Sequence, residues 1–192
     1  MEYRGIPIEQ LAKKAEFLEV AYLVIHGSLP SNEQYKTWKS KIMTHTMLHS
    51  EIGNMMKSFR YNAHPMGILI STVAALSTFH PEDNPALMGS KIFQDEEKVN
   101  KMMYRVIGTM PTMAANAYRH RIGRSYNKPD STMGYVENFL MMLDIMGNER
   151  LIPHKKIVEA LNLLFILHAD HEQNCSTAVS YTHLTLPTIC SV

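Results

Sequence analysis

Apolar residues recur at three- and four-residue spacing along most of the chain, which is the pattern of amphipathic helices. The first run occupies one helical face: Ile8, Leu11, Ala12, Ala15 and Leu18. A second run, residues 17–25, stops before Gly27, a residue that commonly ends helices because it tolerates left-handed backbone. Ser31 and Gln34 have the spacing of a capping box, so we expect a third helix that runs from there towards His45.

The later parts of the chain continue this pattern. Residues 66–76 are apolar all round, which predicts a helix buried on every side. A long helical pattern over 95–120 contains Pro111, whose ring and missing N–H should kink that helix or split it. A further helix is predicted over 135–146. The last predicted helix begins at Pro153 and has one face made of four positions: Ile157, Leu161, Leu164 and His168.

The pattern as a whole predicts an all-α fold. No strand-like alternation of useful length precedes residue 179. Neither an internal repeat nor a linker marks a second domain, and the short connections favour antiparallel helices packed in one body.

Composition narrows the classes of partner and compartment. The 19 basic and 18 acidic residues give a net charge of +1, which argues against a nucleic acid or a membrane surface as partner. No stretch approaches the ~20 apolar residues of a spanning helix, and residues 1–5 resemble neither a signal peptide nor a presequence. With only Cys175 and Cys190, a disulfide framework is not expected, and a soluble protein in a reducing compartment is predicted.

Two histidine pairs are candidates for chemistry. His45 and His49 are four residues apart, so on one helix they would share a face, as metal ligands do. The alternative is that both are polar residues on a partly exposed helix. His168, Asp170 and His171 form a closer group of ionisable side chains and are the stronger candidates. However, histidines at a helix end also cap free carbonyls there.

The segment around the second pair resembles a known family. Residues 167–177, with the sequence Leu-His-Ala-Asp-His-Glu-Gln-Asn-Cys-Ser-Thr, are similar to the citrate synthase motif in which a buried helix delivers a histidine to oxaloacetate. Further family motifs occur in the same order at 3–11, 17–23 with 27–30, 63–66, 110–115 and 137–140. The loop 80–87 and the turn 144–148 resemble the peroxisomal (glyoxysomal) branch and its bacterial relatives.

This resemblance implies a fold, a reaction and a site. The fold would be part of the multi-helix large domain of citrate synthase. The reaction would condense acetyl-CoA with oxaloacetate through acid–base groups, with no metal and no cofactor besides acetyl-CoA as substrate. His171 falls on the family's oxaloacetate-binding histidine, Asn174 on a residue that supports the same loop, and His168 on an orienting or packing position. The family's catalytic aspartate and two catalytic histidines belong to segments beyond this motif, so no catalytic residue is assigned.

The resemblance also implies partners, compartments and limits. The complete enzyme would be a homodimer, in peroxisomes, glyoxysomes or the mitochondrial matrix of a eukaryote, or in the cytoplasm of a bacterium. We expect a partial large domain over 1–178 that is inactive alone, and the sequence before Met1 is also expected to be truncated. Residues 179–192 follow no family pattern and are expected to be a foreign or disordered tail.

Three alternative functions stay open. The first is a 2-methylcitrate synthase, which would use propionyl-CoA in the same reaction. The second is a stand-alone helical module that binds a metal or a protein partner through its histidine pairs. The third is a purely structural partner that pairs with a full-length subunit through its exposed helices.

Overall fold

A computed structural model describes residues 2–144 and 152–170 of the chain, and it is all-α apart from one short hairpin. Strand β1 (Glu2–Tyr3) pairs antiparallel with β2 (Ile6–Pro7), and Tyr3 lies opposite Ile6. The two turn residues, Arg4 and Gly5, have φ values of 51° and 79°, which suit a tight two-residue hairpin turn. The predicted all-α fold is confirmed, and each strand of the hairpin is too short to show strand-like alternation in the sequence.

The chain forms two compact units, residues 1–30 with 162–192 and residues 31–161. The first unit holds the hairpin, α1 (Ile8–Lys14), α2 (Phe17–His26) and the carboxyl-terminal part of α9 (Lys155–Leu167). Its core consists of six buried residues: Tyr3, Ile8, Leu11, Val20, Leu23 and Ile166. Helix α2 ends at Gly27 with φ 83°, as the sequence predicted.

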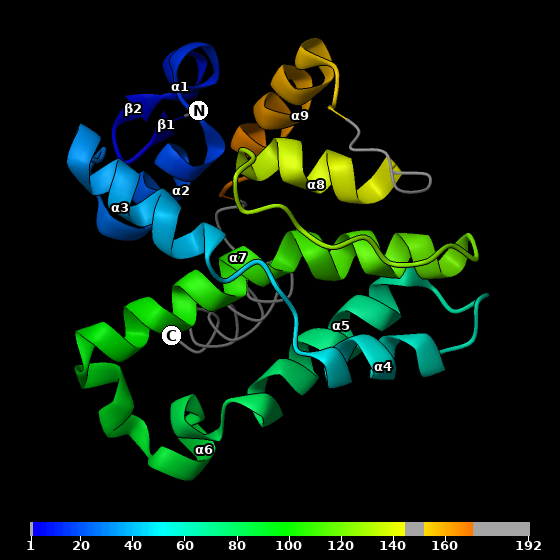
Figure 1. Cartoon of the computed structure of the whole chain (residues 1–192). Coiled ribbons are helices and arrows are strands. Elements are labelled where there is room, and N and C mark those ends of the chain that lie inside the picture. Colours follow the sequence, from blue (N-terminus) through cyan, green and yellow to red (C-terminus); the bar gives the residue numbers. More distant parts are fainter. Residues whose placement is uncertain (1, 145–151, 171–192) are drawn as a thin grey trace, which may run out of the picture. The chain divides into compact units, whose positions relative to one another are not determined.

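The second unit contains the remaining elements (Figure 1). Its long helices are α3 (Asn32–Met43), α4 (Ser50–Ser58), α5 (Pro65–Leu76), α7 (Glu96–Arg121) and α8 (Tyr135–Asp144). Short turns join α5 to α7: η1 (Ser77–Phe79), η2 (Pro81–Asp83), α6 (Pro85–Met88) and η3 (Ser90–Gln94). The capping box of α3 is confirmed, because Ser31 and Gln34 exchange hydrogen bonds between side chain and backbone.

Helix α7 organises the second unit, because α3, α4, α5 and α8 all pack against it. It continues through Pro111, and its ribbon changes direction along its length, so the helix is bent and not split (Figure 1). The end of α3 approaches it closely at Gly108. A Cβ atom there would lie 2.5 Å from the carbonyl oxygen of Ile42, so only glycine fits.

Helix α5 is less buried than its sequence predicted. Ile68, Thr72 and Leu76 are buried, but Met66 is 53% and Ile70 is 64% exposed. The expectation of burial on every side was therefore wrong. The helix packs against α4 and α7, and its other face remains apolar and open.

Candidate functional site

The predicted oxaloacetate site lies at the carboxyl end of α9, in the first unit. Of its three predicted residues, the structure describes His168, while His171 and Asn174 lie outside the described residues. The geometry described below is therefore that of the helix end that precedes residue 171.

Two polar side chains hold this helix end in place. The buried hydroxyl of Tyr3 donates to the carbonyl oxygens of Ile166, at 3.0 Å, and Leu167, at 3.3 Å. These carbonyls belong to the last helical turn, and that of Ile166 also accepts from the backbone N–H of Ala169 at 3.2 Å. A residue near the start of the chain thus fixes the point at which the chain leaves α9.

Asn162 makes the second attachment, one helical turn earlier. Its Oδ1 accepts from the backbone N–H of Phe17 at 2.8 Å, and its Nδ2 donates to the carbonyl of Ala15 at 3.2 Å. Both groups of the amide are used at the junction of α1 and α2. The rings of Phe17 and Phe165 stack edge to face beside it, 5.3 Å apart.

His168 itself bonds to its own helix. Its Nδ1–H donates to the carbonyl oxygen of Leu164 at 2.8 Å, and the side chain is exposed. A histidine in the last turn of a helix interacts favourably with the free carbonyls and with the negative end of the helix dipole. This contact fixes the ring against the end of α9.

The face predicted to anchor α9 is not the face that does so. Ile157 is 56% exposed, Leu164 is 50% exposed, and His168 is exposed too. The anchoring residue is Ile166, which is fully buried. Helix α9 has apolar residues on two faces, and the sequence alone did not show which face packs against the rest of the unit.

The first histidine pair does not share a helix face. Helix α3 ends at Met43 and α4 begins at Ser50, so His45 and His49 lie in the connection between them. Nδ1 of His45 donates to the carbonyl of Lys41 at 2.7 Å, while Nδ1 of His49 accepts from the N–H of Glu51 at 3.2 Å. The hypothesis that the two histidines bind a metal from one helix face is therefore wrong. The alternative, that both lie on a partly exposed helix, is wrong as well, because neither lies on a helix.

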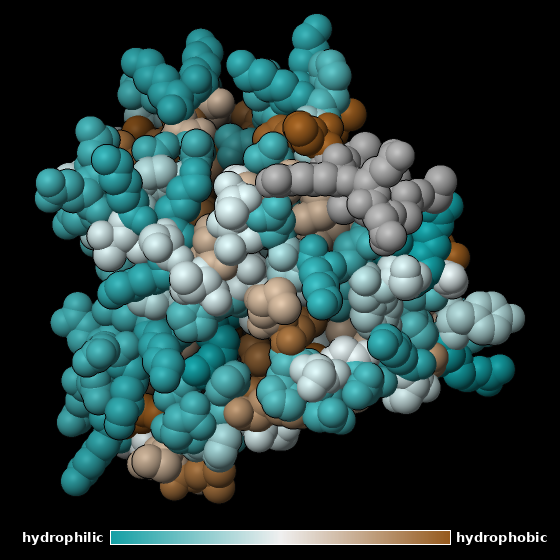
Figure 2. All heavy atoms as spheres, in the orientation of Figure 1, coloured by the Kyte–Doolittle hydropathy of each residue, from teal (hydrophilic) through white to brown (hydrophobic). Residues whose placement is uncertain are grey.

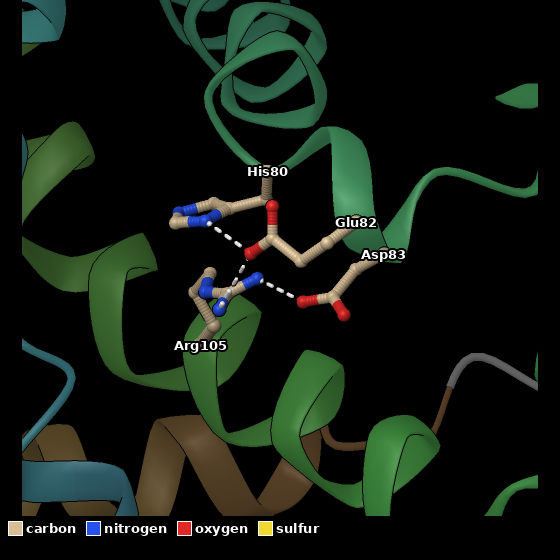
Figure 3. A network of polar contacts seen from close by, with 4 residues as sticks. All are labelled: His80, Glu82, Asp83 and Arg105. Carbon is tan, nitrogen blue, oxygen red and sulfur yellow. Dashed lines mark hydrogen bonds and ion pairs between the residues drawn. The ribbon is translucent and has the colours of Figure 1, made fainter. Parts of the chain in front are cut away.

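A second concentration of polar side chains lies in the other unit, where η2 meets α7 (Figure 3). The buried guanidinium of Arg105 pairs with the carboxylate of Asp83 at 2.5 Å, and its other nitrogen lies 3.9 Å from Glu82. The Glu82 carboxylate also accepts from Nδ1 of His80 at 3.3 Å. Burial, and next to it the positive charge of Arg105, lowers the pKa of His80 below its ordinary value.

A cavity of about 230 Å³ adjoins this network, and its walls are mostly apolar. It is lined by residues of α5, α7 and the turns between them, among them Val73, Leu76, Met102, Arg105 and Val106. Because Arg105 already has two carboxylate partners, its positive charge is compensated within the chain. The arrangement fastens the 77–83 turns to α7 and needs no ligand to be complete.

Neither a metal cluster nor a spanning helix is found in the part of the chain that the structure describes. No group of three or more His, Cys, Asp or Glu side chains within 2–144 and 152–170 is placed to hold a metal ion. Over the same residues, no helix is both long and apolar enough to cross a membrane.

Sequence reasoning missed the residues that position the site. Tyr3 stands within one of the family motifs, but nothing in the motif indicates that its hydroxyl reaches a helix end 163 positions later. Asn162 could have been suspected, since it is a polar residue within the otherwise apolar run from Ala160 to Leu164.

The sequence matches the family model "Citrate synthase, C-terminal domain" over residues 1–185. It is 58% identical over 178 residues to a protein of Dictyostelium discoideum named citrate synthase, covering 93% of this chain and 35% of that protein. It is 43% identical over 180 residues to the glyoxysomal citrate synthase of Cucurbita maxima, covering 94% of this chain and 35% of that protein. The chain thus spans about a third of the length of these relatives.

The fold also has solved counterparts. The crystal structure of citrate synthase from Pyrobaculum aerophilum superposes with a TM-score of 0.78 at 30% identity, covering 88% of this chain and 41% of that chain. A citrate synthase from Thermotoga maritima gives 0.68 at 27% identity, covering 91% and 41%.

Proposed function

The chain belongs to the citrate synthase family, and from that premise we propose that it is part of an enzyme that condenses acetyl-CoA with oxaloacetate. The proposal rests on the way in which side chains hold the carboxyl end of α9 in place. Tyr3 and Asn162 fix the helix from which the family motif at 168–174 departs. A fixed helix end restricts the movement of the motif that follows it. This is what a residue needs if it must bind its substrate in one orientation.

The proposed reaction consists of a carbon–carbon bond formation and a hydrolysis. A base removes a proton from the methyl group of acetyl-CoA, and the resulting enol attacks the ketone carbon of oxaloacetate. Water then cleaves the thioester of citryl-CoA, which gives citrate and free CoA. These steps use acid–base groups, so we propose that no metal and no cofactor besides the acetyl-CoA substrate takes part.

Within this chain, the proposed roles concern oxaloacetate. An N–H of His171 donates to the carbonyl or a carboxylate of oxaloacetate and polarises it for attack. Asn174 supports the loop that carries His171, and His168 orients the chain just before it. The base and the groups that stabilise the enol are proposed to lie outside this chain, which would therefore be inactive alone.

We also propose that the complete enzyme is a homodimer that uses the open faces of α5 and α7. Helix α5 carries no charged residue, and Met66 and Ile70 are exposed on it. Along α7 and just beyond its end, Val106, Tyr118 and Ile122 are each more than two-fifths exposed. The uncharged apolar face of α5, together with these exposed positions of α7, has the character of a protein–protein contact. Analytical ultracentrifugation of the complete enzyme with Ile70→Glu should then show loss of the dimer.

The function itself is tested by activity of the chain alone and of a completed enzyme. Purified residues 1–192 should release no CoA from acetyl-CoA and oxaloacetate above a heat-inactivated control. Residues 1–178 joined to the remaining part of a relative should be active. In that enzyme, His171→Ala should lower kcat by about 10²–10³ and weaken oxaloacetate use, with little change for acetyl-CoA.

His45→Ala is the matched control, since this histidine bonds to the carbonyl of Lys41 in a connection far along the chain from the motif. Its kinetics should match those of the unsubstituted enzyme. Turnover by the isolated chain, or unchanged oxaloacetate kinetics in His171→Ala, would contradict the proposed placement of the groups.

A further inference from the structure

The cavity beside Arg105 in the second unit takes no part in the proposed oxaloacetate site. It has a volume of about 230 Å³ and lies between α5, α7 and the turns that join them. Its wall is mostly apolar, with Val73 and Leu76 on α5 and Met102 and Val106 on α7. Val106 is 41% exposed, and Ser77, also in the wall, is exposed too, so small molecules can enter from the solvent.

Buried charged groups form the polar part of the cavity wall. Arg105 and Asp83 both line the cavity, and they are only 9% and 7% exposed. Nη1 of Arg105 donates to the carboxylate of Asp83, whereas Nη2 lies 3.9 Å from the carboxylate of Glu82, which is too far for a hydrogen bond (Figure 3). Within the described part of the chain, the guanidinium therefore keeps N–H groups that can donate to a further acceptor.

The charges beside the cavity select against anions. The positive charge of Arg105 faces two carboxylates, those of Asp83 and Glu82. The ring of His80 is neutral at pH 7, because burial, and next to it the charge of Arg105, lowers its pKa. The local charge is therefore negative. It repels an anionic ligand, whereas an uncharged acceptor can still bond to the guanidinium.

We propose that this cavity binds a small uncharged molecule with an apolar ring and one hydrogen-bond acceptor, such as an aryl ketone. The ring lies against Val73, Leu76 and Met102, and the acceptor bonds to an N–H of Arg105. The volume is sufficient, since an apolar cavity of about 150 Å³ accepts benzene. The bound ring removes apolar surface from water on α5 and α7, and this provides the affinity.

Three probes of similar size test each part of the proposal with the full chain. Acetophenone has the ring and a neutral acceptor, toluene lacks the acceptor, and benzoate carries a negative charge. In a chain with ¹³C-methyl methionine, Met102 reports on the cavity wall, while Met47, 57% exposed between α3 and α4, reports on nonspecific contact. Acetophenone should shift the Met102 signal to saturation and leave Met47 unchanged. Toluene should bind about tenfold more weakly, because it cannot accept from the charged donor, and benzoate should also bind more weakly than acetophenone.

Two neighbouring exposed residues provide a matched pair of variants. Ser77 lines the cavity and Thr78 does not, and each hydroxyl donates to the carbonyl three positions before it, at 2.8 and 2.7 Å. Ser77→Trp places a large ring at the cavity and should weaken acetophenone binding about tenfold or more. Thr78→Trp loses the same kind of hydrogen bond and adds the same ring, but it should leave the binding unchanged. Both variants avoid Val106, which also belongs to the proposed dimer face.

Each measurement also has an outcome that overturns the proposal. A Met102 shift that does not saturate, or an equal shift of Met47, would mean that acetophenone makes only nonspecific contacts. Equal affinity of Ser77→Trp and Thr78→Trp, at equal helical content by circular dichroism, would exclude this cavity as the site. If Ser77→Trp loses helical content, the contrast between Met102 and Met47 decides alone. Benzoate binding as tight as that of acetophenone would contradict the selection of an uncharged ligand.

Discussion

Helices α7 and α9 have similar apolar periodicity, but the chain buries much more of α7 than of α9. Ten residues of α7 are buried, whereas the buried residue of α9 is Ile166. On α9, Leu163, Leu164 and Leu167 are each more than a third exposed, and apolar atoms lie at the surface over this helix (Figure 2). The comparison shows that an apolar stripe specifies a surface to be covered and does not identify what covers it.

The two helices also differ in what fixes them. Along α7, four neighbouring helices and a glycine contact set the position of the backbone. At the end of α9, the position depends on individual polar side chains, chiefly Tyr3 and Asn162. Substitutions should therefore cost most where backbones touch, less where one amide or hydroxyl is removed, and least on the open face.

The largest effect is expected for Gly108→Val in α7. Its Cβ would lie 2.5 Å from the carbonyl oxygen of Ile42 and 3.0 Å from the backbone of His45, and backbone atoms cannot turn aside as a side chain can. We expect about 3 kcal/mol of lost stability or failure to fold. Urea unfolding followed by far-UV circular dichroism measures this. Gly53→Ala in α4 is the control: nothing lies within 4 Å of its Cβ, so stability should stay equal or rise.

The sequence predicted the fold correctly where a feature acts on residues close to it along the chain. Gly27 and the Ser31–Gln34 box marked real helix boundaries, because each acts through backbone within one turn. The third helix was predicted to run towards His45 and ends at Met43, but the sequence did not show that both His45 and His49 lie beyond its end, since residues 44–49 contain neither glycine nor proline. The open face of α5 was missed for another reason, because composition alone does not reveal how many neighbours a helix has.

The candidate site could be predicted as a motif but not as a geometry. The string 167–177 identified the segment, whereas the residues that hold it, Tyr3 and Asn162, act on groups 163 and 145 positions away in sequence. No periodicity or spacing rule relates positions so far apart. The ion pair of Arg105 with Asp83 was missed in the same way, because two charged residues in a sequence do not indicate burial.

The next effect in size is expected for Asn162→Ala. The substitution leaves the N–H of Phe17 and the carbonyl of Ala15 without their partner, in a partly buried setting. Removing one partner of such contacts costs the desolvation of the groups left behind, about 2 kcal/mol for the two together. Asn54→Ala is a comparison within the other unit, where an exposed contact of 3.4 Å to the Glu51 carboxylate is lost, and the midpoint of urea unfolding should fall less. An equal or smaller fall for Asn162→Ala would contradict its role as the stronger attachment.

A smaller effect is expected for Tyr3→Phe, which removes only the hydroxyl that donates to Ile166 and Leu167. The ring continues to fill the core, so the loss should be about 1 kcal/mol in the free energy of unfolding. Amide exchange of the last turn of α9 should increase more than exchange in α2, because the freed carbonyls belong to that turn. Tyr118→Phe, at a half-exposed position on α7, should leave both measurements unchanged.

The smallest effect on stability is expected on the open face of α9, and it tests the comparison between the two helices most directly. Leu164 is 50% exposed and Ile166 is fully buried, two positions apart on the same helix. Leu164→Gln should therefore change the free energy of unfolding by less than about 0.5 kcal/mol, while Ile166→Gln buries an amide without a partner and costs several times more. Because Leu164→Gln also makes an exposed apolar surface more polar, light scattering should show slower self-association at equal helical content. If the two substitutions cost the same, the face that carries Leu164 is covered after all, and α9 is held on both of its apolar faces.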